Sequence, residues 1–127
     1  MESVIFKRKA YQKLLEWKRD SAGKTALLIE GARRIGKSTL VEQFAKKEYK
    51  SYILIDFANI KPQVSNLIAN GFADLDDFFT RLQFLSGVQL YERQSLIIFD
   101  EVQLHPLARQ AIKYLVKDGR YDYVEAG

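Results

Sequence analysis

Gly31-Ala32-Arg33-Arg34-Ile35-Gly36-Lys37-Ser38 is the stretch that decides the fold of this 127-residue chain. It matches the pattern of a phosphate-binding loop, in which a glycine and four variable residues precede Gly-Lys-Ser/Thr. The two glycines let backbone N–H groups approach an anion closely, and a helix that starts near Lys37 would direct its positive dipole end toward the same anion. The alternative is an ordinary turn with a surface lysine.

The residues on either side of the octapeptide favour the phosphate-binding interpretation. Residues 25–30 are mostly apolar and are typical of a buried strand, and apolar residues at helical spacing predict a helix from the loop to about residue 48. Strand, loop and helix in this order are the context that the motif requires. We therefore expect a nucleotide site that comprises Gly31, Ala32, Arg33, Arg34, Ile35, Gly36, Lys37, Ser38 and Thr39.

Two side chains of this loop have specific expected roles. The ammonium group of Lys37 is expected to reach the β and γ phosphates, which makes it a candidate catalytic residue, and the hydroxyl of Ser38 is expected to bind Mg²⁺. Arg33 and Arg34 occupy variable positions, where exposure to solvent is the simpler interpretation and contact with a partner is the alternative.

A second motif, Ser95-Leu-Ile-Ile-Phe-Asp-Glu101, has the form of a buried parallel strand that ends at a ligand site. Asp100 is expected to hold Mg²⁺, and Glu101 is the candidate catalytic residue that orients a water molecule for attack on the γ phosphate. Two solvated acids at the end of a strand are the alternative. The Asp-Glu pair favours an ATPase over a small GTPase, and it makes a nucleoside kinase less favoured without excluding one.

Composition limits the class of protein. The chain is 47% hydrophobic and 13% aromatic and has no cysteine, which indicates a globular protein without disulfides and is typical of a cytoplasmic location. No apolar stretch approaches the ~20 residues that span a bilayer, so no membrane partner is expected. The net charge of +4 is concentrated in residues 1–50, which carry 13 Lys/Arg and 6 Asp/Glu. This bias leaves open a second hypothesis, a basic nucleic-acid-interacting module with a regulatory or vestigial nucleotide site.

The remaining sequence predicts alternating helices and strands. Asp74 and the His105-Pro106 pair are typical of helix starts, and Gly87 and Gly119 of helix ends. Asp56 and His105 are more typical of capping than of catalysis. The predicted helices are 7–20, 62–70, 75–86 and 106–118, and the further predicted strands are 51–57, 95–100 and 121–126.

With both motifs in place, the chain resembles the N-terminal part of a bacterial and archaeal AAA-type P-loop ATPase family. Its members join this core to a C-terminal domain of poorly known function. The resemblance covers nearly the whole chain, and the stretches that carry it are 31–40, 52–57, 96–103, 115–123 and the helix around residues 11–17.

The resemblance implies an α/β, three-layer P-loop NTPase fold with a mostly parallel sheet, and ATP and Mg²⁺ as cofactors. We expect residues 1–127 to form a single, partial ATPase domain with residues 1–22 as a helix packed on it. The expected strand order is 1-4-3-2, truncated after the fourth core strand of a parent order 5-1-4-3-2. The first strand would then be an exposed edge open to self-association, and ATP hydrolysis could be impaired.

Overall fold

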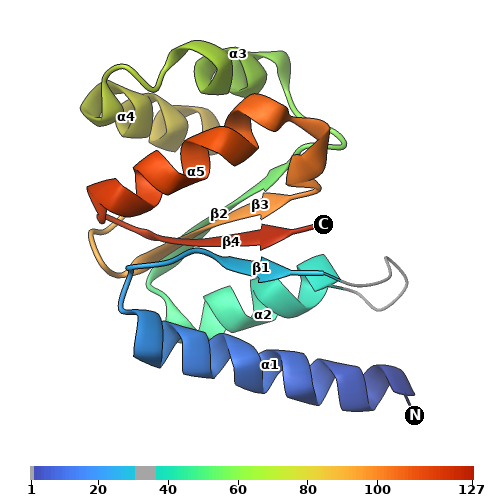
Figure 1. Cartoon of the computed structure of the whole chain (residues 1–127). Helices are drawn as coiled ribbons and strands as arrows, with labels where there is room; N and C mark the ends of the chain where they lie inside the picture. Colours follow the sequence, from blue (N-terminus) through green and yellow to red (C-terminus); the bar gives the residue numbers. More distant parts are fainter. Residues whose placement is uncertain (1, 31–36) are drawn as a thin grey trace.

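The computed structural model describes residues 2–30 and 37–127, with side chains described for residues 7–30 and 39–127. Helices and strands alternate along most of the chain (Figure 1). The elements are α1 (Glu2–Ser21), β1 (Leu27–Ile29), α2 (Lys37–Glu48), β2 (Ser51–Asp56), α3 (Pro62–Asn70), α4 (Leu75–Ser86), β3 (Ser95–Asp100), the short 3₁₀ helix η2 (Val102–Leu104), α5 (Pro106–Asp118) and β4 (Asp122–Ala126).

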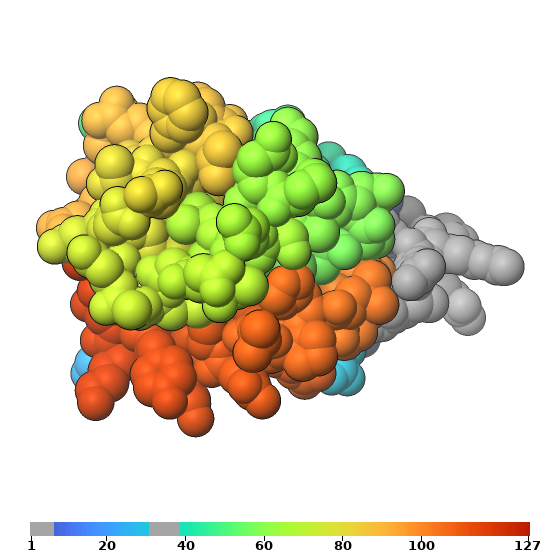
Figure 2. Space-filling view, turned by 90° about the horizontal axis from the view of Figure 1, so that it is seen from above, coloured from blue at the N-terminus to red at the C-terminus, as the bar shows by residue number. Residues whose placement is uncertain are grey.

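The four strands form one parallel sheet in the order β1-β4-β3-β2, which confirms the expected order. Helices α1 and α2 lie on one face of the sheet and α3, α4 and α5 on the other, so the fold has three layers (Figure 1). Figure 2 looks onto the face that α3, α4 and α5 cover. Strands β1 and β2 are the two edges of the sheet.

Each face of the sheet has its own apolar core, because successive residues of a strand point to opposite sides. Tyr123 of β4 packs into the core beneath α3, α4 and α5, whereas its neighbour Val124 packs into the core beneath α1 and α2. Strand β3 is buried from Ser95 to Phe99, as expected for a central strand of a parallel sheet.

The predicted helix caps are present. The Asp74 carboxylate accepts a hydrogen bond from the Asp77 N–H at the start of α4, and His105 Nδ1 accepts one from the Ala108 N–H at the start of α5. Gly87 and Gly119 end these two helices in left-handed conformation. Local polar chemistry therefore sets the bounds of α4 and α5.

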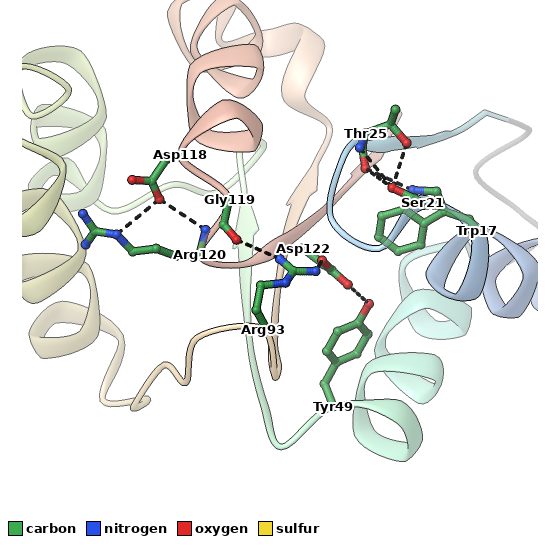
Figure 3. Close-up of polar contacts among 9 residues, drawn as sticks. All are labelled: Trp17, Ser21, Thr25, Tyr49, Arg93, Asp118, Gly119, Arg120 and Asp122. Atoms are coloured by element: carbon green, nitrogen blue, oxygen red, sulfur yellow. Dashed lines mark hydrogen bonds and ion pairs between the residues drawn. The ribbon is translucent and has the colours of Figure 1, made fainter.

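Two predicted starts differ from the structure by two residues or more. Strand β1 begins at Leu27 rather than at residue 25, because the Thr25 N–H binds Ser21 Oγ and the Thr25 carbonyl accepts from Trp17 Nε1, so Thr25 belongs to the preceding turn (Figure 3). Helix α1 begins at Glu2 rather than at residue 7. Residues 2–6 contain no proline or glycine that would interrupt a helix.

A buried polar cluster joins three elements at the end of the sheet where β4 begins (Figure 3). Asp122 is 5% exposed; one carboxylate oxygen accepts a hydrogen bond from the Tyr49 hydroxyl at 2.5 Å, and the other lies 2.5 Å from Arg93 Nη2. Arg93 Nη1 also donates to the Gly119 carbonyl at 3.0 Å. Burial, reinforced by the bond to Asp122, raises the pKa of the Tyr49 hydroxyl far above its ordinary value.

This shift predicts how stability responds to alkaline pH. The unfolded chain releases the Tyr49 proton near pH ~10 and the folded protein retains it, so its contribution is complete below that pH and is lost as the pH rises further. We expect Tyr49→Phe to lower the free energy of unfolding by about 1 kcal/mol at neutral pH. Above pH ~10, the stability of the variant should fall less steeply than that of the wild type, by about 1.4 kcal/mol per pH unit.

Urea unfolding at a series of pH values measures both effects. Tyr114→Phe is the matched control, since the Tyr114 side chain is exposed, and its slope should equal that of the wild type. A wild-type slope in Tyr49→Phe would show that the buried hydroxyl does not govern alkaline stability.

Candidate functional site

The carboxyl ends of all four parallel strands lie at the same end of the sheet (Figure 1). At this carboxyl end, Asp100 is the last residue of β3, and its partners in register are Asp56 of β2 and Ala126 of β4. Helix α2 begins at Lys37, after the chain leaves β1 at Ile29. The topology therefore brings the acidic end of the central strand and the first turn of α2 to the same side of the molecule.

Helix α2 is held in this position by its apolar face. Leu40, Val41, Phe44 and Ala45 are buried in the core that Ile98 and Val124 of the sheet complete. Thr39, the last residue of the expected nucleotide-binding set, is exposed on the helix. The rest of that set lies outside the described residues. It comprises Gly31, Ala32, Arg33, Arg34, Ile35 and Gly36, together with the side chains of Lys37 and Ser38.

The two acidic residues at the end of β3 differ in backbone conformation. Asp100 is half-buried and still belongs to the strand, and its carbonyl accepts a hydrogen bond from the Phe57 N–H at 2.9 Å. Glu101 is also half-buried but has a left-handed backbone, with φ 58° and ψ 40°. Its N–H donates to the Ala126 carbonyl at 2.6 Å, which ties this turn to the end of β4.

A left-handed glutamate is costly, because its Cβ crowds the backbone, and such residues gather at functional sites. The left-handed turn redirects the backbone immediately after Asp100. It is also the point at which η2 begins. Asp100 is therefore the last residue of the strand, and Glu101 belongs to the turn that leads into η2.

Sequence reasoning assigned no role to Gln103. Its Nε2 donates a hydrogen bond to Glu101 Oε2, so the amide holds the glutamate carboxylate. Its Oε1 lies where a side chain at Gly127 would be, since an added Cβ there would be 2.4 Å from that oxygen. The only available signal was a polar residue two positions after the acidic pair.

Both carboxylate oxygens of Asp56 accept hydrogen bonds from the loop that follows β2. Asp56 accepts them from the Ala58 N–H at 3.0 Å and from Asn59 Nδ2 at 3.2 Å, which confirms the expected structural role. His105 caps α5 and lies against the Phe57 ring, at a centroid distance of 5.4 Å. Neither residue was predicted to be catalytic.

A recess of about 380 Å³ adjoins the Glu101 turn. It lies between the end of β1, η2 and the start of α5, and it is lined by Leu28, Glu30, Val102, Gln103, Arg109 and Gly127. Among the residues that the structure describes, no group of three or more histidine or acidic side chains is arranged to hold a metal. None of the described helices is long and apolar enough to cross a bilayer.

The strand order and the position of α2 after β1 define a P-loop NTPase-like α/β fold. Comparison with protein families gives the same class: residues 23–127 match the family described as AAA domain. The chain belongs to this family, which indicates an ATPase-like module that binds nucleotide. Searches of curated proteins and of solved structures gave no match.

The left-handed backbone of Glu101 leads to a test by substitution. Glycine at position 101 should leave the free energy of unfolding within about 1 kcal/mol of the wild type, because relief of the left-handed strain offsets the chain entropy of glycine. Valine should lower it by about 2 kcal/mol, because a β-branched residue fits this region poorly. Chemical denaturation of Glu101→Gly and Glu101→Val measures the difference.

Glu92 provides the matched pair of controls, since it is exposed, lies in a turn and is not among the residues with positive φ. Glu92→Val should be at least as stable as Glu92→Gly. Equal stability of the two variants at position 101 would mean that the glutamate backbone stores no strain.

Proposed function

We propose that residues 1–127 form a single ATPase domain that binds ATP with Mg²⁺ and hydrolyses it to ADP and phosphate. The observation that supports this most is the acidic pair Asp100-Glu101 at the end of the central strand, on the same edge as the first turn of α2. Membership of the AAA domain family supports the nucleotide; the hydrolytic role is our inference from the acidic pair.

In the proposed site, the loop at residues 31–36 and the first turn of α2 bind the phosphates through backbone N–H groups, with Lys37 on the β and γ phosphates. Ser38 and Asp100 offer a hydroxyl and a carboxylate, which are oxygen ligands of the kind that Mg²⁺ prefers. The ion usually takes its other ligands from nucleotide phosphates and water, and when bound it would neutralise charge on the phosphates.

Glu101 is the proposed base. Its carboxylate orients a water molecule in line with the γ phosphorus and accepts a proton from this water as the new P–O bond forms and the bond from the γ phosphorus to the bridging oxygen breaks, which releases ADP. Gln103 acts as a positioning residue, because its amide holds one carboxylate oxygen of Glu101. Asp100 ends β3 and Glu101 lies in the turn that follows it, so in this proposal one acid serves the ion and the other the water.

The first test is calorimetric titration of Mg-ATP into the wild type and Lys37→Ala. We expect Lys37→Ala to weaken binding by about 30-fold or more, because it removes a charge-assisted contact to phosphate. Lys46→Ala, an exposed lysine in the last turn of the same helix, is the control and should bind as the wild type does. Absence of binding by folded wild type would refute the proposed nucleotide site in this chain.

Hydrolysis is tested separately with Glu101→Gln. This variant keeps the shape of the side chain, so ATP affinity should stay within about twofold while turnover falls by about 100-fold. Unchanged turnover would remove Glu101 from the mechanism. Salt-sensitive DNA binding that survives in Lys37→Ala, with no turnover in the wild type, would instead favour the basic nucleic-acid-interacting module.

The positioning role of Gln103 predicts a different kinetic pattern. Gln103→Leu should lower kcat by about tenfold and leave KM nearly unchanged, because the amide acts on the glutamate and not on the nucleotide. Gln103→Asn offers the same amide on a shorter arm and should recover part of kcat. Equal losses in kcat for leucine and asparagine would indicate that Gln103 supports only packing against Gly127.

A further inference from the structure

A second and larger groove, of about 850 Å³, lies between α5 and the turn that precedes β1. The turn contributes residues 22–26, and Arg93 and Gly119 also line the groove. The turn rests on Arg93: Gly23 has a positive φ, and a Cβ added there would lie 2.4 Å from the Arg93 guanidinium. This wall of the groove is therefore fixed by the Arg93–Asp122 cluster (Figure 3).

The groove is strongly basic. The cations that line it are Lys24, Arg93, Arg109, Lys113 and Lys117, and Glu125 is the one acidic residue among the described residues that line it. Asp122 balances the charge of Arg93. The three cations of α5 are exposed and recur every fourth residue, so they form a row along one side of the helix with a spacing of about 6 Å.

Apolar side chains lie beside this row. Ala26 and Val116, both half-buried, line the same groove, and Ile112 is buried behind them in the core beneath α5. None of the described residues that line the groove is aromatic, so it offers no surface for stacking of nucleobases. A strip of apolar residues next to a row of cations complements an amphipathic segment with an acidic side.

We propose that this groove binds an acidic amphipathic helix of a partner protein. Acidic residues at every fourth position of such a helix match the spacing of Arg109, Lys113 and Lys117 on α5. Its apolar side covers Ala26 and Val116, in the way that a helix covers an open face of an α/β sheet. The proposal does not depend on nucleotide binding.

The probe is a synthetic helical peptide with glutamate at every fourth position and leucine along the adjoining side, labelled for fluorescence anisotropy. The variant Arg109→Gln/Lys113→Gln/Lys117→Gln should bind this peptide about tenfold more weakly than the wild type, because three exposed ion pairs contribute about twofold each. Raising the ionic strength should weaken wild-type binding, and Glu125→Gln should strengthen it.

The matched control is Arg8→Gln/Lys9→Gln/Lys13→Gln, which removes one arginine and two lysines that are exposed on α1. It should bind the peptide as the wild type does, and circular dichroism should show that both triple variants are folded. Equal losses in the two triple variants, or no binding by the wild type, would overturn the proposal. So would tighter binding of a single-stranded oligonucleotide that depends on the same three α5 cations.

Discussion

The arrangement of this protein depends on the pairing of β3 between β2 and β4. Six register pairs join β3 to β2, and five join it to β4, all in parallel. The strand is buried on both faces, so Leu96 and Ile98 complete one core while Ile97 and Phe99 complete the other. A one-residue slip of β3 would exchange these sets and disrupt both cores, so the register is strongly specified.

The register also determines which residues lie at the carboxyl end of the sheet. Because the strands are parallel, the residue after each core segment arrives at the same side, and Asp100 lies between Asp56 and Ala126. The hydrogen bond from the Glu101 N–H to the Ala126 carbonyl extends this order one residue beyond the strand. The position of the candidate catalytic acid is thus a consequence of the apolar packing of β3.

Much of this fold follows from local sequence signals. Residues 75–86 and 106–118 were predicted as helices with the bounds that are observed, because an N-cap residue and a terminal glycine mark both ends. The strand at 95–100 follows from its unbroken apolar run. The start of β1 was predicted wrongly because the hydrogen bonds of Thr25 come from Trp17 and Ser21, eight and four residues earlier in the chain.

Likewise, only part of the candidate site could be predicted from the sequence. The order Asp100-Glu101 after an apolar strand is visible in the sequence, whereas the left-handed conformation of Glu101, its bond to the Ala126 carbonyl and the contact of Gln103 with it are visible only in the structure. The Arg93–Asp122–Tyr49 cluster is further from prediction, since its hydrogen bonds join residues 29 and 73 positions apart. Contacts at that range depend on the completed sheet, and no local pattern encodes them.

The two ends of the sheet therefore have different physical tasks. At the end where β4 begins, a buried carboxylate with two donors joins β4 to the residue that follows α2 and to the turn before β3, and these satisfied bonds favour rigidity. At the carboxyl end, a glutamate holds a costly backbone conformation, and the half-buried acids lie on the same side of the molecule as the first turn of α2. Strain at one end is tolerable because the opposite end and the two cores fix the strands independently of it. Substitutions at Glu101 that tolerate its left-handed backbone should thus act mainly on chemistry and those at Asp122 mainly on stability, since the sheet keeps the two ends apart.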